Sequence, residues 1–270
     1  MTSKFPELQL VSDLHLNIYK LTIQYKGSNY SGFQIQIKDR TIQGELNNAL
    51  KILSKTDGVK SIGSGRTDAG VHALGQVVKI EIPVDIPETG LMKGLNSHLP
   101  HDIRVIKAEK SDENFHPIYS ANSKEYNYVF STQQMITPFA DELVTHFPYE
   151  LDIELMKKGC RAFCGEHDFI NYQCTGTDVE TTVRKIFECE LNHFSGEGHF
   201  KELLTDYYVL RVVGNGFLKQ MVRLMMGALW SLGRGKITLE ELEKSLKIPL
   251  ERRLGATAPP QGLYLKEVHY

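Results

Sequence analysis

The order of predicted strands and helices is the feature that most limits what this chain can fold into. Apolar residues recur at every second position in a half-buried strand and at every third or fourth position in an amphipathic helix. These periods predict alternating strands and helices in the first half of the chain, at 19–25, 41–53, 59–63, 78–82, 91–99 and from 103 onward. The first half is therefore predicted to follow the order β-α-β-β-α-β.

The second half is predicted to repeat this order. Its expected elements lie around 126–130, 152–163, 187–191, 208–212, 217–232 and 263–265, with an extra helix that Thr238 and Glu241 begin as a capping box. Two such units predict an α+β protein with two ferredoxin-like halves that share a mainly antiparallel sheet, with a cleft between them. If the two sheets join, a pseudo-twofold axis is expected to relate the halves.

A polar, aperiodic stretch at 111–123 separates the two predicted units. Stretches of this kind are typical of domain boundaries, where few contacts cross. We therefore expect an N-terminal arm at 1–16, a first domain at 17–115 that carries the loop described below, and a second domain at 123–270.

Composition and charge limit the classes of function. The 270 residues are 41% hydrophobic and 24% charged, as in an ordinary soluble globular protein. No apolar run predicts a membrane span and no signal peptide pattern is present, so a cytoplasmic location is expected. The net charge of −2 and the pI of about 6.6 give no global sign of nucleic-acid binding. An RNA site would need a local basic patch, and the candidates in or beside predicted loops are Lys26, Lys38, Arg40, Lys219, Arg234 and Lys236.

The glycine-rich loop GSGRTDAGVHALGQVV, at 63–78, is the strongest candidate for a functional site. Its glycines flank Arg66 and Asp68, and glycine lets a ligand or a second backbone approach closely. A polar loop of this kind feeding an apolar strand often carries chemistry, although a tight surface turn is the alternative. The loop lacks the third glycine of a dinucleotide-binding motif and the Gly-Lys of a P-loop, so no nucleotide cofactor is expected.

Other residues are candidates on weaker grounds. Arg223 lies in an otherwise apolar helix, so it either finds a partner near the core or faces solvent. Tyr126 begins the aromatic face of a strand, where it either packs in the core or stacks on a base. His72 is four residues beyond Asp68 and is a candidate base, but a loop histidine is more often structural.

A loose set of metal-ligating side chains occurs in the second half. Cys160, Cys164, His167 and Cys174 resemble a zinc set, but the first two fall on the apolar face of a predicted helix. Buried free cysteine mostly behaves as a small hydrophobic residue. We therefore expect no metal site.

The glycine-rich loop resembles the signature loop of the TruA-type tRNA pseudouridine synthase family. Further blocks resemble that family in the same order, namely YKGSNYSGFQ (25–34), TIQGEL (41–46), GLNSHLPHDIRV (94–105), FHPIYSANSKEYNY (115–128), GEHDF (165–169), FLKQMVRLMMGAL (217–229) and APPQGLYLKEV (258–268). The resemblance covers nearly the whole chain after the first sixteen residues.

The resemblance implies a role for each of five residues. Asp68 corresponds to the catalytic aspartate, and Arg66 to an arginine that helps keep the target base flipped out. Tyr126 corresponds to a tyrosine that stacks on the target uracil. Arg223 corresponds to an arginine that pairs with the catalytic aspartate, and Leu265 to an apolar wall of the pocket.

The implied activity is the isomerisation of uridine to pseudouridine in the anticodon stem–loop of tRNA, around nucleotides 38–40. The resemblance also implies a homodimer, with tRNA crossing between subunits, and no cofactor. One alternative is a non-catalytic tRNA-binding or folding factor on the same scaffold. The other is a nucleoside hydrolase that uses Asp68, but a glycosidase usually needs a second carboxylate. The nearest candidates, Glu45 and Glu81, fall on regular elements.

Overall fold

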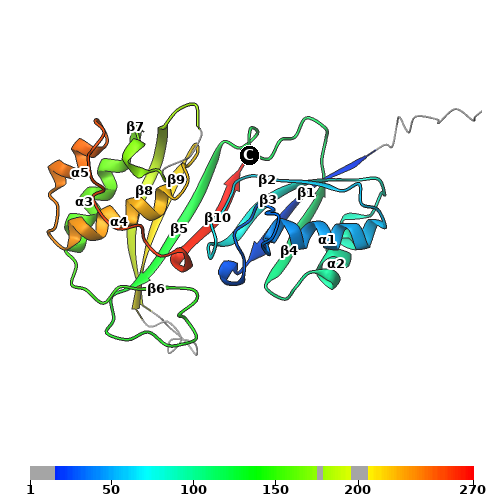
Figure 1. Cartoon of the computed structure of the whole chain (residues 1–270), viewed down its shortest axis with the longest axis horizontal. Coiled ribbons are helices and arrows are strands. Elements are labelled where there is room, and N and C mark those ends of the chain that lie inside the picture. The colour runs from blue at the N-terminus through cyan, green and yellow to red at the C-terminus, as the bar shows by residue number, and fades with distance from the viewer. Residues whose placement is uncertain (1–15, 175–178, 196–205) are drawn as a thin grey trace, which may run out of the picture.

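A computed structural model describes residues 16–174, 179–195 and 206–270, and nearly all of the predicted N-terminal arm lies outside these ranges. The described strands form one open sheet in the order β4-β1-β3-β10-β5-β9-β8-β7, with β2 paired to β3 and β6 paired to β5. The sheet is mostly antiparallel, and helices pack on it at both ends of the molecule (Figure 1). The predicted α+β class is confirmed.

The N-terminal half has the predicted order of elements. They are β1 (Asn17–Tyr25), α1 (Ile42–Ser54), β2 (Lys60–Gly63), β3 (His72–Ile82), α2 (Glu88–His98) and β4 (Ile103–Lys110). The Thr41 hydroxyl accepts a hydrogen bond from the Gly44 amide at 3.2 Å, which satisfies one of the unpaired N–H groups at the start of α1. All strand pairs in this half are antiparallel, in the order β4-β1-β3-β2.

The C-terminal half repeats this arrangement and adds two short strands. Its elements are β5 (Ser123–Ser131), β6 (Thr145–His146), α3 (Ile153–Phe163), β7 (Gly165–Asp168), β8 (Val183–Ser195), β9 (Asp206–Gly214), α4 (Met221–Gly233), α5 (Leu239–Ser245) and β10 (Leu263–His269). The order β10-β5-β9-β8 matches β4-β1-β3-β2 strand for strand. The capping box predicted at Thr238 and Glu241 is confirmed. The added strands β6 and β7 had no clear periodic signal, because they are only two and four residues long.

The two halves follow one another along the sheet. The strand order runs in the same direction in each half, whereas a twofold axis would reverse it in one of them. The expected pseudo-twofold relation is therefore wrong. The halves join where the start of β3 pairs in parallel with β10, through His72 with Tyr264 and Ala73 with Leu265. Further along, the same edge of β3 pairs with β2. The loop between β2 and β3 consequently leaves the sheet at the seam between the halves.

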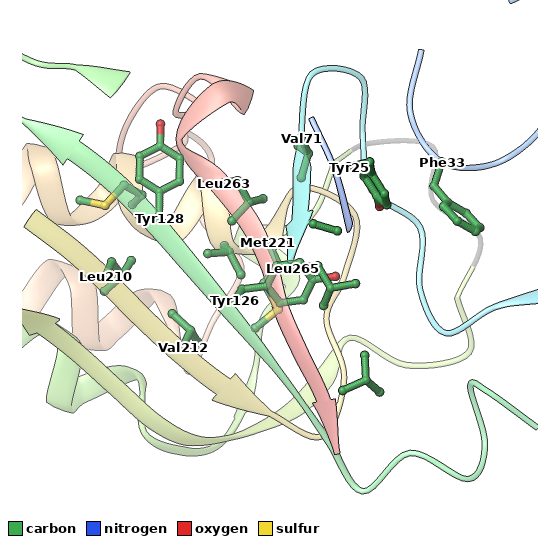
Figure 2. Close-up of a cluster of buried hydrophobic side chains, with 14 of the residues drawn as sticks. Tyr25, Phe33, Val71, Tyr126, Tyr128, Leu210, Val212, Met221, Leu263 and Leu265 are labelled. Atoms are coloured by element: carbon green, nitrogen blue, oxygen red, sulfur yellow. The ribbon is translucent and has the colours of Figure 1, made fainter. Parts of the chain in front are cut away.

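An apolar core continues across this seam. Figure 2 shows Tyr126 of β5, Leu265 of β10 and Met221 of α4 close together, and all three are buried. Val71 extends the same cluster toward the N-terminal half. Because one cluster contains side chains from both halves, their relative position is fixed by packing as well as by strand pairing.

Helix α4 begins four residues later than its apolar stripe predicts. Phe217 belongs to that stripe in the sequence, but the helix begins at Met221, after a turn in which Gln220 has a φ of +63°. The Met221 amide closes this turn on the Leu218 carbonyl at 3.1 Å. The turn releases Phe217 to pack edge-on against Tyr126, with ring centroids 4.9 Å apart. Across the described ranges, helices are too short or too polar to cross a membrane.

Candidate active site

A cleft of about 890 Å³ lies at the seam and is lined by both halves. The N-terminal half supplies segments 31–36 and 65–71, and the C-terminal half supplies 217–223 with side chains from β5 and β10. Asp68, Arg66, Tyr126 and Arg223 are all among the lining residues. These candidates come from one loop, which carries Arg66 and Asp68, and from β5 and α4, so only the folded chain brings them together.

Hydrogen bonds fix the backbone on either side of Asp68. The Thr67 carbonyl accepts a hydrogen bond from the Phe33 amide at 3.1 Å, and the buried Thr67 hydroxyl lies 2.8 Å from the Tyr25 hydroxyl. The Asp68 carbonyl accepts from the Val71 amide at 3.1 Å, which closes a turn. With its backbone fixed in this way, Asp68 directs a carboxylate that is 23% exposed into the cleft.

Among the residues that the structure describes, Arg223 forms the only ion pair of Asp68, with Nη1 and Oδ2 3.3 Å apart. Its Nε donates to the Ala258 carbonyl at 2.7 Å, and the Ala258 amide donates back to the Arg223 carbonyl at 3.1 Å. The arginine side chain is only 12% exposed, so the alternative that it faces solvent is wrong. A partly buried arginine that is held at Nε presents Nη1 to the carboxylate in a fixed orientation.

Tyr126 lies beside the loop that carries Asp68. Its ring packs against Phe217, and a β-carbon placed on Gly65 would be 3.8 Å from its hydroxyl. Burial, with a further contribution from the charge of Asp68, raises the pKa of the Tyr126 phenol. The phenol therefore keeps its proton at neutral pH, which disfavours it as a base.

The remaining two candidates differ in their exposure. Arg66 is exposed on the cleft wall, and no ion pair or hydrogen bond of its side chain is found within the described residues. Leu265 is fully buried against Tyr126 across the β5–β10 pair and does not line the cleft. The apolar surface of β10 that the cleft presents is Leu263. The leucine that reaches the cleft is thus two residues earlier than the resemblance suggested.

Comparison with known proteins identifies the family. The tRNA pseudouridine synthase family matches residues 21–120 and 160–270, which is most of the chain. The chain belongs to this family. It is 36% identical to tRNA pseudouridine synthase A of Lacticaseibacillus casei and 41% identical to that of Bacillus pumilus. Each alignment covers 252 residues, which is 93% of this chain and 99% and 98% of the relatives. The protein of the same name from Listeria innocua is 37% identical over 253 residues.

The pseudouridine synthase cleft also contains side chains that sequence reasoning did not select. Phe33, Lys124 and Phe217 all line it. Lys124 is two residues before Tyr126 on β5, so the period of two places both on one face of the strand. The sequence therefore allowed Lys124 to be found from its spacing to Tyr126. Phe217 could not be found in this way, because its apolar spacing fits the helix that follows equally well.

His72 is not placed to act as a base in this pseudouridine synthase cleft. It is buried outside the cleft, where its Nδ1 accepts from the Gly27 amide at 2.9 Å. That contact leaves Nε2 protonated, and Nε2 donates to the Gln261 carbonyl at 3.1 Å. The ring also stacks on Tyr264, with centroids 4.8 Å apart. His72 therefore connects the two halves, which is a structural role.

The buried site of His72 predicts a pH dependence of stability. Burial lowers the pKa of the His72 imidazole below its ordinary value, so the unfolded chain binds a proton that the folded chain excludes. Stability should therefore fall as pH drops below about 6.5, by at most about 1.4 kcal/mol per pH unit from this group. Urea unfolding at pH 7.5 and 5.5 should show a larger loss for wild type than for His72→Gln. Equal losses in the two proteins would contradict the role of His72.

Gly27 is a glycine near the site whose replacement should cost stability. A β-carbon on Gly27 would lie 2.0 Å from the Val71 carbonyl oxygen, which is backbone and cannot turn aside. Gly27→Ala is expected to lower the free energy of unfolding by about 1–3 kcal/mol or more. Gly65→Ala is the matched control, because the nearest atoms would be 3.7 Å away. Similar urea midpoints for the two variants would show that the segments at Gly27 and Val71 separate easily.

The cysteines do not assemble a metal site in the described part of the chain. No group of three or more histidine, cysteine, aspartate or glutamate side chains is suitably placed there. Cys160 is buried in α3, and the His167 imidazole is hydrogen-bonded to the Cys164 carbonyl at 2.9 Å. His167 therefore contacts the backbone of this cysteine.

Proposed function

We propose that this chain isomerises uridine to pseudouridine in the anticodon stem–loop of tRNA, around nucleotides 38–40, with Asp68 as the nucleophile. The observation that carries the proposal is the contact between Arg223 and Asp68 in a cleft built from both halves. Relatives named tRNA pseudouridine synthase A support the reaction and the class of RNA.

The ion pair suits a carboxylate that must supply an electron pair. The neighbouring guanidinium, bonded to the carboxylate through Nη1, restricts the orientation of Asp68. As the nucleophile, Asp68 forms a bond to C1′ of the ribose, and that bond breaks again when C5 attaches. The alternative is that Asp68 acts as a base, which takes a sugar proton and later returns it. In both cases the N1–C1′ bond breaks, the uracil turns, and a C5–C1′ bond forms. The hydrogen leaves C5, and N1 gains one, so no redox partner is required.

The target base has to leave its stack before Asp68 can reach the sugar. Unstacking costs a few kcal/mol, and stacking on an aromatic ring returns about 1–3 kcal/mol per base. Tyr126, held edge-on by Phe217, supplies such a ring beside the carboxylate. Arg66 is exposed on the same wall of the cleft, and we propose that it helps to keep the target base flipped out of the RNA stack.

The charge of the cleft favours RNA although the whole chain is slightly acidic. Arg66, Lys219 and Arg223 line it beside Lys124, whose ammonium is bonded to a backbone carbonyl, and Asp68 is the single carboxylate among the lining residues. The family resemblance implies a homodimer that tRNA crosses, and we propose the same assembly here, because a second copy would add a second basic groove. Light scattering at micromolar concentration should give the mass of a dimer. A monomer at that concentration would contradict this assignment.

The proposed target can be mapped directly. An unmodified tRNA transcript is incubated with the protein, and each pseudouridine is located after chemical labelling. We expect modification around nucleotides 38–40 and its loss when the modified uridine is replaced by cytidine. Pseudouridine formed only in other arms of the tRNA would overturn the assignment to the anticodon stem–loop and would leave the isomerase activity intact.

A further inference from the structure

Lys124 reaches from the C-terminal half to the backbone of the catalytic loop. It lies on β5, and its Nζ donates to the Ser64 carbonyl at 2.6 Å across the seam. Burial lowers the pKa of the Lys124 ammonium. A half-buried ammonium bonded to a neutral carbonyl costs free energy, so the contact calls for a function.

The segment just before Arg66 is held from two sides. Gln76, fully buried on β3, accepts from the Ser64 hydroxyl at 2.6 Å and donates to the Gly65 carbonyl at 2.8 Å. Lys124 holds the Ser64 carbonyl. The carbonyls of these two successive residues are thus fixed by different halves of the protein. Lys124 therefore links the C-terminal half to the start of the loop by a direct hydrogen bond.

Lys124 also has a fixed relation to the stacking ring. Lys124 and Tyr126 are two residues apart on β5, so they share one face of the strand. Gly65 lies beneath both side chains, because a β-carbon there would be 3.7 Å from the ammonium and 3.8 Å from the tyrosine hydroxyl. One strand therefore sets the place of the ring and, through the ammonium, the place of the loop that carries Asp68.

We propose that Lys124 is a positioning residue, which holds the Ser64 carbonyl so that Asp68 stands at the right distance from a base stacked on Tyr126. The proposal rests on the proposed function, because it concerns the same reaction. It assigns to Lys124 an effect on the chemical step without contact to the uridine. A displacement of about 1 Å at a reacting group can lower a rate by about 10²-fold.

Kinetics provide the first test. Lys124→Met should lower kcat for pseudouridine formation by about 10- to 100-fold while KM changes by less than about threefold. Lys124→Arg should recover a large part of kcat, because a guanidinium can also donate to the carbonyl. The matched control is Lys79→Met. Lys79 is a buried lysine that donates to the Glu113 carbonyl at 3.0 Å and does not line the cleft. This control should leave kcat unchanged.

Hydrogen exchange without RNA provides a test that does not depend on activity. Amide exchange at 64–67 should be faster in Lys124→Met than in wild type and unchanged in Lys79→Met. If wild type formed no pseudouridine, the proposed function would fail while this measurement still reported on the loop. Unchanged exchange, or an unchanged kcat with a raised KM and a weaker salt dependence, would overturn the proposal. The kinetic pattern would instead identify Lys124 as a phosphate contact.

Discussion

Asp68→Asn is expected to abolish pseudouridine formation, with a loss in kcat of about 10³-fold or more. Asparagine has nearly the same shape but cannot supply the electron pair that the reaction needs. The fold should survive, because the Asp68 side chain is 23% exposed and its ion pair is partly solvated. Single-turnover rates with saturating protein measure the chemical step.

An identical substitution elsewhere separates a catalytic effect from a general one. Asp57→Asn is the control, because Asp57 is 94% exposed in its side chain and lies in the same half, away from the cleft. It should keep the wild-type rate, and both variants should keep the wild-type urea midpoint. An Asp68→Asn variant with more than about a tenth of the wild-type rate would exclude Asp68 as the nucleophile.

Arg223→Met is expected to have the second largest effect, a loss of about 10²-fold or more in kcat together with a loss of stability. The substitution removes the ion pair to Asp68 and leaves the Ala258 carbonyl without the Nε donor. An unsatisfied buried carbonyl costs about 1–3 kcal/mol, which urea unfolding would report. Arg223→Lys should recover stability only in part, since one ammonium cannot reproduce the geometry of the fork.

The double variant tests whether Arg223 acts through Asp68. If the arginine works by orienting that carboxylate, then adding Arg223→Met to Asp68→Asn should lower kcat little further. Fully additive losses would show that Arg223 has a separate role, such as a direct contact to the RNA.

The elements of the fold were predictable from the sequence because each half carries its own periodic signals. The spacing of apolar residues predicts the strand β1 and the helix α1. The residue type of Thr41 marks the start of that helix. The joining of the halves was not predictable, because the parallel pair of β3 with β10 depends on the register between residues about 190 positions apart. The wrong expectation of a pseudo-twofold axis has this cause.

The site divides in the same way. The loop with Arg66 and Asp68 is local, so glycine content and polarity were sufficient to select it. The pairing of Arg223 with Asp68 spans 155 residues, and only the family resemblance suggested it. Leu263 was missed because nothing local marks which face of β10 borders the cleft, whereas Lys124 shares a face of β5 with Tyr126 and could have been inferred from it. The burial of His72 likewise depends on Gly27 and Gln261, which the sequence places far from it.

The most direct test of the central claim is an analysis of the products made from tRNA labelled with tritium at C5 of uracil. Isomerisation predicts that tritium release, uridine loss and pseudouridine gain are equal for wild type, with no free uracil and no reaction in Asp68→Asn. Free uracil would identify a hydrolase. Bound but unchanged tRNA would identify a binding factor. Either result would contradict the account.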